Sequence, residues 1–315
     1  MTEQRHVIFG VGPLGMAVMD ALAAQGQTVV LVNRSGKVKE PLPAGVTTAA
    51  ADLNDPAQVR QLCAEAQVVY LCAMPPYTDW PRLFPPMIQG LLGGLAGSAA
   101  RLVYGDNLYM YGPTDGKPLR EDLPYAAPGH KGRLRAEMAQ QLLAAHQAGK
   151  VKVTIGRASD FYGPRAFNAH LGDRFFKAVF AGKPVDVIGN PDQPHTYTFI
   201  RDYARGLVTL GAHDEALGQA WHIPSPAAIT PRQLIALVST ELGQPLKIRA
   251  AGRLLVSVLG LFDPIMRELK ETLYQWEKPY LVDHSKFAAA FGANPTPHPV
   301  AVRETVAWFR SKQNG

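Results

Sequence analysis

The 315-residue sequence predicts an α/β fold, in which a doubly wound parallel sheet is joined by a smaller mixed α/β C-terminal lobe. Two observations predict this fold. Apolar runs typical of buried strands alternate with helical stretches from the N-terminus to residue 156, and beyond residue 164 that alternation loosens into helices, short strands and many prolines. We therefore expect a first domain at residues 1–165 and a second lobe at 166–315 that is partly interleaved with the sheet.

A glycine-rich turn links the first predicted strand, at residues 7–9, to a helix at 16–24. The turn consists of Gly10, Val11, Gly12, Pro13, Leu14 and Gly15. Gly10 and Gly12 permit a tight turn and the close approach of a phosphate, whereas Gly15 lets helix and strand pack closely. The start of the helix adds free N–H donors. This arrangement indicates a Rossmann-like domain whose turn holds the pyrophosphate of a dinucleotide.

The end of the second strand indicates which dinucleotide is bound. The apolar run at residues 28–32 is followed by Asn33, Arg34 and Ser35. A site for NAD usually carries an acidic residue here for the ribose 2′-hydroxyl, whereas a site for the 2′-phosphate offers Arg and small polar groups. The acid is absent, so the sequence favours NADP over NAD. Alternatively, Arg34 and Lys37 only lie in a solvated loop.

The ends of the third and fourth strands supply the remaining candidates for the cofactor site. Asp52 and Leu53 follow the third strand, at residues 46–51, and Ala73 and Met74 follow the fourth, which two prolines then stop. In an open parallel sheet this edge is where ligands bind. Asp52 either accepts a hydrogen bond from the adenine amine or only caps its loop.

Further elements follow from the same patterns. We expect strands at 101–104 and 151–156 and helices at 56–66, 87–96, 133–147, 231–242 and 300–312. Asp55 and Thr230 stand where N-caps are expected, and Gly243 stands just past the end of the fourth of these helices.

The composition is that of a globular protein, with 47% hydrophobic and 18% charged residues. The net charge of +6 and the pI near 9.3 suit an anionic ligand such as a phosphorylated cofactor. Lys and Arg are scattered without a run of five, which argues against nucleic acid as a partner.

Cysteine usage and hydropathy predict the surroundings of the protein. Cys63 and Cys72 lie nine positions apart in apolar segments, which suits buried free thiols and no metal site. The polar N-terminus does not resemble a signal peptide, and the apolar stretch at 254–262 is too short to span a bilayer. We expect a cytoplasmic protein with no membrane contact.

Four segments together resemble a known family. They are the glycine turn, the run LVYGDNLYMYG at 102–112, RASDFYGP at 157–164 and DHSK at 283–286. Their order is similar to that in extended short-chain dehydrogenases/reductases, the NAD(P)-dependent epimerase/dehydratase proteins. The resemblance covers nearly the whole chain and implies an NAD(P)-dependent hydride transfer.

The chain departs from this family where its members carry their catalytic groups. The family has a Ser-rich stretch ending the fifth strand, followed by a Tyr-x-x-x-Lys pair on the next helix. Counting back from Tyr111, the usual serine position falls on Asn107, whose amide can orient a carbonyl. Aligning Glu137 with the acid that commonly follows the lysine puts Arg133 at the lysine position and Gly129 at the tyrosine position.

Proton transfer therefore needs another group. His130 titrates near neutrality and is the first candidate, although a solvated loop histidine is the alternative. Arg133 can supply a fixed positive charge near the nicotinamide ribose but cannot exchange a proton. The other groups left open as donors are Lys131, Tyr109, Tyr111 and Tyr125.

The second half of the chain bears on the substrate. His195 lies near the position of an arginine that contacts the diphosphate in sugar-nucleotide members of the family, so its presence counts against a nucleotide sugar. An apolar substrate pocket or an ordinary core would equally explain a set of large side chains. These are Tyr77, Trp80, Phe161, Leu259, Phe262, Tyr274 and Trp276.

Three functions remain open. The first is an atypical NADP-dependent oxidoreductase that acts on a small carbonyl or hydroxyl substrate, with Asn107, His130 and Arg133 as catalytic residues. The second is an epimerase or dehydratase of a sugar-type substrate. The third is a binding protein without catalysis that senses NADP(H). In each case the expected partner is a small molecule, and the resemblance suggests a homodimer.

Overall fold

The computed structural model describes residues 5–252, 261–262 and 264–313 of the chain. Two compact units emerge from the contacts between residues. Unit 1 consists of the chain up to Asn107 with Arg133–Arg157 and Tyr203–Ile223, and unit 2 of Leu108–Gly132, Ala158–Asp202 and the chain from Pro224 on. The chain thus passes between the units several times.

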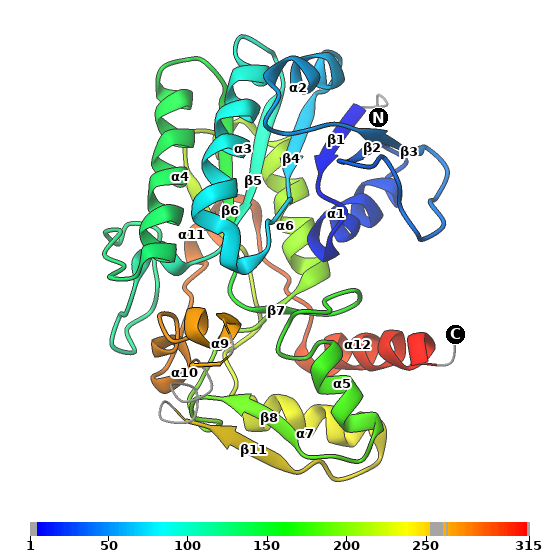
Figure 1. Cartoon of the computed structure of the whole chain (residues 1–315), viewed down its shortest axis with the longest axis vertical. Coiled ribbons are helices and arrows are strands. Elements are labelled where there is room, and N and C mark those ends of the chain that lie inside the picture. The colour runs from blue at the N-terminus through cyan, green and yellow to red at the C-terminus, as the bar shows by residue number, and fades with distance from the viewer. Residues whose placement is uncertain (1–4, 253–260, 263, 314–315) are drawn as a thin grey trace. The chain divides into compact units, whose positions relative to one another are not determined.

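Unit 1 contains a seven-stranded parallel sheet (Figure 1). Its strands are β1 (Arg5–Phe9), β2 (Thr28–Asn33), β3 (Val46–Ala50), β4 (Val68–Leu71), β5 (Arg101–Asp106), β6 (Lys152–Arg157) and β10 (Ala220–His222). They are ordered β10-β6-β5-β4-β1-β2-β3, so the direction of winding reverses between β1 and β4. This confirms the predicted doubly wound sheet and adds β10, which the sequence analysis missed.

Helices cover both faces of this sheet. They are α1 (Pro13–Ala23), α2 (Pro56–Cys63), α3 (Trp80–Leu95), α4 (His130–Gln147) and α6 (Ile200–Ala212). A Cβ on Gly105 of β5 would lie 2.8 Å from Leu14 of α1 and 3.4 Å from Leu207 of α6, so these two helices share one face. Helices α2, α3 and α4 lie side by side on the other (Figure 1). Right-handed crossovers produce this division.

Helix α3 begins at Trp80, not at residue 87 as predicted. Pro85 and Pro86 lie inside it and remove two backbone donors, which is why the sequence pattern favours a later start. Burial of Trp80 and Phe84, which expose 1% and 0% of their surface, favours the longer helix. Packing of this first turn therefore outweighs the loss of backbone hydrogen bonds.

Predicted helix ends agree closely elsewhere. Asp55 caps α2 by accepting from the backbone nitrogens of Ala57 and Gln58, at 2.9 and 3.3 Å. Thr230 forms a capping box with Gln233 at the start of α7 (Pro231–Leu242). That helix ends at Gly243, whose φ of 68° is the left-handed conformation that glycine adopts most easily.

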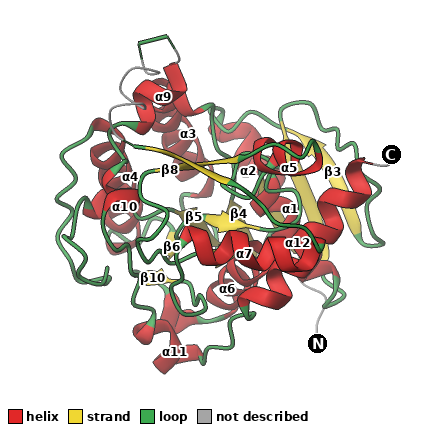
Figure 2. Ribbon diagram, turned by 90° about the horizontal axis from the view of Figure 1, so that it is seen from below, coloured by secondary structure: helices red, strands yellow, loops and turns green. Residues whose placement is uncertain are grey.

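Unit 2 is a mixed α/β lobe, in which short strands pair two by two. The pairs are β7 (Phe161–Tyr162) with β9 (Thr198–Phe199) and β8 (Val185–Ile188), which is labelled in Figure 2, with β11 (Ile248–Ala251). The other helices are α5 (Asp173–Phe180), α9 (Pro264–Leu269), α10 (Tyr274–Glu277), α11 (Ser285–Phe291) and α12 (His298–Gln313), with a 3-10 turn, η2 (Tyr109–Tyr111). Side chains of α5, α7, α12 and β8 form its main core.

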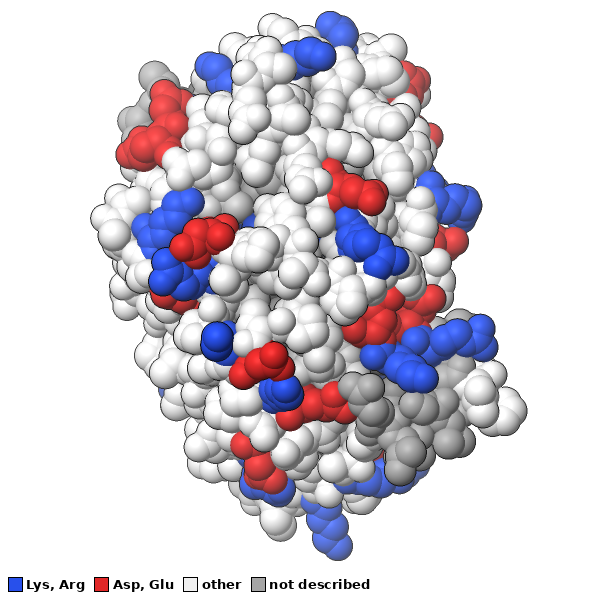
Figure 3. Space-filling model, turned by 90° about the vertical axis from the view of Figure 1, so that its left-hand side faces the viewer, with Lys and Arg blue, Asp and Glu red and all other residues white. Residues whose placement is uncertain are grey.

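Surface and burial bear on several expectations. No helix in the described ranges is long and apolar enough to cross a membrane. On the face in Figure 3, basic and acidic side chains lie in mixed groups. Cys63 is buried as predicted, but Cys72 is only partly buried, and both are free. Of the large apolar set, Phe262 is 85% exposed and is not core, while Leu259 lies outside the described residues.

Candidate functional site

The predicted cofactor residues lie together in unit 1, at the carboxyl ends of β1, β2, β3 and β4. These strands are neighbours in the sheet, and backbone hydrogen bonds continue past their ends. Gly10 N donates to Val32 O at 2.9 Å, and Cys72 N donates to Phe9 O at 2.8 Å. The residues that follow these strands, including Ala73 and the exposed Met74, therefore share one edge.

The three glycines of the turn have different surroundings. Gly10 has a φ of 111°, and a Cβ there would lie 2.5 Å from Ala73 N. A Cβ on Gly15 would lie 1.9 Å from Gly10 O, so α1 packs directly on the turn. A Cβ on Gly12 would have nothing within 4 Å among the described residues. Gly10 and Gly15 are therefore needed for packing, whereas Gly12 faces open space.

The start of α1 fits an anionic group. Pro13 is the first residue of the helix, and no side chain in the described ranges caps it. The next backbone nitrogens, of Leu14 and Gly15, are among the first four of the helix and have no intrahelical acceptor. Uncapped donors beside the open space at Gly12 suit a pyrophosphate.

The loop after β2 is fixed by Asn33. Its Oδ1 accepts from the backbone nitrogen and the hydroxyl of Ser35, both at 3.0 Å, and its Nδ2 donates to Lys37 O at 2.8 Å. Arg34 is exposed beside it. After β3, Asp52 accepts from Asn54 N at 3.0 Å, as its loop-capping alternative requires. Leu53 is buried, and contact of these residues with a cofactor stays a prediction.

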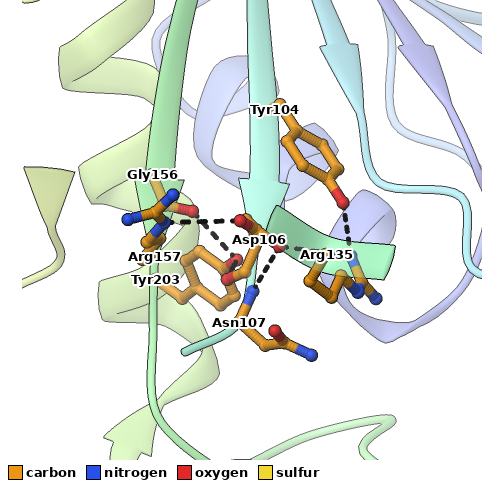
Figure 4. Close-up of polar contacts among 7 residues, drawn as sticks. All are labelled: Tyr104, Asp106, Asn107, Arg135, Gly156, Arg157 and Tyr203. Atoms are coloured by element: carbon orange, nitrogen blue, oxygen red, sulfur yellow. Dashed lines mark hydrogen bonds and ion pairs between the residues drawn. The ribbon is translucent and has the colours of Figure 1, made fainter. Parts of the chain in front are cut away.

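A buried polar network holds the end of β5 (Figure 4). The Asp106 carboxylate accepts from Asn107 N at 2.9 Å and pairs with Arg135 at 3.2 Å and Arg157 at 3.3 Å. Tyr203 donates its hydroxyl proton to the Asp106 carbonyl oxygen at 2.7 Å. These contacts fix the backbone from which the Asn107 side chain projects.

Arg135 is stabilised in this buried position by more than Asp106. Its guanidinium lies 4.3 Å from the ring centre of Trp80 and 4.4 Å from that of Phe84, and it donates to the Tyr104 hydroxyl. Arg135 was not predicted, whereas the predicted residue, Arg133, lies on the exposed side of α4. The signal was the helical spacing, which puts Arg135 on the buried face with Met138 and Ala139.

Two glutamates that the sequence analysis missed meet the start of α4 in unit 2. The His130 ring pairs through Nδ1 with Glu271 Oε2 at 2.6 Å and through Nε2 with Glu268 Oε2 at 3.3 Å. Lys131, which is fully buried, pairs through Nζ with Glu268 at 2.7 Å and donates its backbone N–H to Glu271 at 2.6 Å. The two basic residues are therefore held by two carboxylates.

Glu271 also explains the glycine at position 129. A Cβ on Gly129 would lie 2.5 Å from Glu271 Cδ and 2.6 Å from its Oε1. The glutamate carboxylate occupies the space in which any side chain at position 129 would begin. No local pattern could reveal this, because the two residues are far apart in the sequence and belong to no common motif.

The His130 pairs define what the ring can do. The short contact of Glu271 with Nδ1 fixes a hydrogen on that nitrogen and orients the ring. Nε2 makes the longer contact, to a Glu268 oxygen that Lys131 approaches more closely. The His130 side chain is 47% exposed. A histidine oriented by a carboxylate, with its second nitrogen exchangeable, suits proton transfer.

One family model matches the chain, over residues 93–223, and it is described as the NAD dependent epimerase/dehydratase family. The matched segment includes β5, Asn107 and the start of α4.

Two curated relatives are both described as dTDP-glucose 4,6-dehydratase. The relative from Actinoplanes is 28% identical and the one from Streptomyces griseus 26% identical, each over 202 residues. The alignments cover 64% of this chain, but 55% and 54% of the relatives. The chain thus spans about half the length of the curated relatives it matches.

Solved structures share the fold along nearly the whole chain. A UDP-glucuronic acid 4-epimerase from Bacillus cereus, in complex with NAD, is 17% identical, with 98% of this chain and 99% of that chain covered at a TM-score of 0.79. A dTDP-glucose 4,6-dehydratase from Bacillus anthracis, also with NAD, is 14% identical, with 99% and 98% covered at a TM-score of 0.81. At these identities the likeness shows the fold alone.

Proposed function

We propose that the chain is a member of the NAD dependent epimerase/dehydratase family, whose model matches residues 93–223, and that it is an epimerase or dehydratase that acts on a sugar-type substrate with a nicotinamide dinucleotide. The activities named for its relatives favour this second hypothesis of the sequence analysis over the first, a reductase of small carbonyl compounds.

The observation that carries the proposal is the glycine turn. Open space at Gly12 and the uncapped start of α1 form a cradle in which the backbone nitrogens of Leu14 and Gly15 hold the pyrophosphate. When bound, a nicotinamide dinucleotide accepts a hydride from a substrate carbon and returns it. The other requirement is a group that takes and returns the hydroxyl proton.

We propose that His130 takes and returns the hydroxyl proton. Oxidation of a substrate alcohol releases a hydride and a proton, and the proton passes to His130 Nε2 while Glu271 keeps the ring oriented through Nδ1. Asn107, fixed through its backbone by Asp106, donates an amide hydrogen bond to the carbonyl oxygen that forms. Arg133 supplies positive charge toward the cofactor ribose.

The preference of the cofactor site for NADP over NAD depends on Arg34. The solved relatives named above bind NAD, which counts for NAD in this chain. In this chain, however, Asn33 ends β2 in place of an acid and is engaged in its own loop, which leaves the exposed Arg34 to meet a 2′-phosphate. We propose that NADPH binds at least about tenfold more tightly than NADH.

Fluorescence titration with NADPH and NADH tests the cofactor proposal. Arg34→Ala is expected to remove most of the difference between the two dissociation constants, since it deletes one charge-assisted contact. Lys39→Ala, which removes a positive charge from the same region of the chain, is the matched control. Equal affinities in the unsubstituted protein, or tighter binding of NADH, would contradict the preference for NADP.

Product analysis by NMR tests the reaction. The substrates are dTDP-glucose, UDP-glucuronic acid and the corresponding phosphate-free sugars. His130→Ala and Asn107→Ala are each expected to lower kcat by about 100-fold or more. His213→Ala is the control, because His213 forms an exposed pair with Glu215 at 3.2 Å. Tight cofactor binding without turnover on any sugar, aldehyde, ketone or quinone would instead favour the NADP(H)-sensing protein.

A further inference from the structure

A second cluster of titratable side chains lies in unit 2, around His195. The His195 ring is 1% exposed, and both of its nitrogens face oxygen atoms. Nδ1 is 3.2 Å from the Gln275 carbonyl oxygen, and Nε2 is 3.0 Å from Asp160 Oδ2. Both nitrogens of the ring are therefore engaged, one by the backbone and one by Asp160, and His195 offers neither of them to a ligand.

Aromatic rings enclose the His195 side chain. Trp276 stacks on it at 4.0 Å and 6°, and Tyr280 lies on it at 5.1 Å and 23°. Burial by itself would raise the pKa of the Asp160 carboxyl, but the hydrogen bond and the charge of His195 outweigh burial and hold that pKa below its usual range. The Asp160 carboxylate therefore keeps its negative charge beside His195.

The reachable part of the cluster is polar but carries no excess positive charge. The Asp160 side chain is 27% exposed, and His170 is partly exposed, with its ring 3.9 Å from that of Trp276. Burial lowers the pKa of His170 from 6.5 to about 4, so its imidazole is neutral at pH 7. A ligand here meets a paired carboxylate and a neutral imidazole.

Two buried polar side-chain atoms lie near the His195–Asp160 pair. Within the part of the chain that the structure describes, neither Tyr280 Oη nor Gln275 Nε2 has a hydrogen-bond partner, although these residues are only 3% and 2% exposed. Burial, with Tyr274 and then Asp160 nearby, raises the pKa of Tyr280 well above its usual range, so its hydroxyl keeps its proton. Buried polar atoms of this kind normally meet a protein group, a water or a ligand.

We propose that Asp160, His170 and Tyr280 form a subsite for an uncharged, hydroxyl-bearing part of the substrate, such as a sugar ring without phosphate. A hydroxyl can donate to the Asp160 carboxylate and accept from the Tyr280 hydroxyl or the His170 imidazole. A phosphate would instead be repelled by the like charge of the Asp160 carboxylate. This inference rests on the proposed function and specifies its substrate class.

Ligand-observed NMR on the protein with its cofactor tests the subsite, with methyl α-D-glucoside and UDP as probes. We expect saturation transfer to the glucoside in the unsubstituted protein and UDP binding no tighter than about 1 mM. Asp160→Asn keeps a hydrogen-bonding group beside His195 but removes the negative charge that repels a phosphate. This variant is expected to lose the glucoside signal and to bind UDP at least about tenfold more tightly at pH 6.

Asp192→Asn is the matched control, because Asp192 pairs with Arg232 at 2.7 Å on the surface of the same unit and should leave both probes unaffected. If Asp160→Asn does not fold, His195→Gln serves instead, and it should retain the glucoside and bind UDP no better. UDP binding to the unsubstituted protein that Asp160→Asn leaves unchanged, or binding of neither probe, would overturn the subsite. Failure of NADPH and NADH to bind would overturn only the proposed function.

Discussion

At the scale of single residues, Gly12 and Gly15 separate cofactor binding from stability. Gly15→Ala places a Cβ 1.9 Å from the backbone oxygen of Gly10, so the free energy of unfolding should fall by about 2–3 kcal/mol. In Gly12→Ala the new Cβ meets open space at a φ of −75°, so the free energy of unfolding should change by less than about 0.5 kcal/mol. The same substitution should weaken cofactor binding at least about tenfold.

Urea unfolding and fluorescence titration of both glycine variants check this prediction. If Gly12→Ala bound the cofactor as the unsubstituted protein does, the pyrophosphate could not lie over Gly12. The assignment of the cradle would then be wrong even if the fold were unchanged.

The Asp106 network gives a second prediction at this scale. Asp106→Asn removes a buried charge that pairs with Arg135 and Arg157, and we expect a loss of about 3–5 kcal/mol of unfolding free energy. Asp214→Asn breaks the pair with Arg101 at 2.7 Å, but Asp214 is 73% exposed, so the loss should be roughly 0–1 kcal/mol. Equal losses in urea unfolding would show that burial does not set the strength of these pairs.

Single-residue chemistry could be predicted only where it is local. The glycine turn shows the required spacing within six residues, and the structure gives each glycine a distinct steric role. The contacts of His130 depend on Glu268 and Glu271, which reach it only through the tertiary fold. Sequence spacing contains no signal for such a pair, since neither glutamate lies at a helical interval from the histidine.

At the scale of elements, β1 carries a buried titratable group. His6 is 4% exposed, and burial lowers its pKa from 6.5 to about 4. The unfolded chain therefore binds a proton at a higher pH than the folded protein does. Stability linked to this group is complete above pH 6.5 and is lost as the pH falls toward 4, with roughly 2 kcal/mol lost by pH 5.

Urea unfolding of His6→Leu at pH 7 and pH 5 checks the sign and the size of this effect. The loss of stability between the two pH values should be smaller in this variant by roughly 2 kcal/mol. His213→Ala, at an exposed position, is the control. An unchanged pH dependence in His6→Leu would exclude His6 as the source.

The elements that the sequence predicts well are those with continuous apolar runs or strong caps. Strands β1, β2, β4, β5 and β6 are buried over most of their length, and α7 has both a capping box and a left-handed glycine at its end. The early start of α3 depends on tertiary packing, which outweighs the effect of the prolines inside the helix. Strand β10 depends on its pairing with β6, which involves only three residues.

At the scale of the whole molecule, cofactor binding should increase the free energy of unfolding. A ligand that binds only the folded state at 100 times its dissociation constant adds about 2.7 kcal/mol. NADPH should therefore raise the thermal midpoint by several degrees in differential scanning calorimetry, and Gly12→Ala should need more NADPH for the same shift. No shift at saturating NADPH or NADH would contradict the proposed cofactor.

The fold class of the whole chain could be predicted, because the alternation of strands and helices extends over most of its length, and the family model matches residues 93–223. The residues that make up each unit could not be read from their position in the chain, since residues 108–132 and 203–223 group by tertiary contacts. The sequence placed a small carbonyl or hydroxyl substrate first and a sugar-type substrate second, whereas the activities named for the relatives favour the sugar-type substrate.

The contact between Gly129 and Glu271 restricts how this protein could evolve. A side chain at position 129 would begin 2.5 Å from the Glu271 carboxyl carbon, so Gly129→Tyr requires Glu271 to move. Removing Glu271 would leave Lys131 N and His130 Nδ1 without their closest carboxylate. Positions 129 and 271 are therefore energetically coupled, and the effect of a substitution at one depends on the residue at the other.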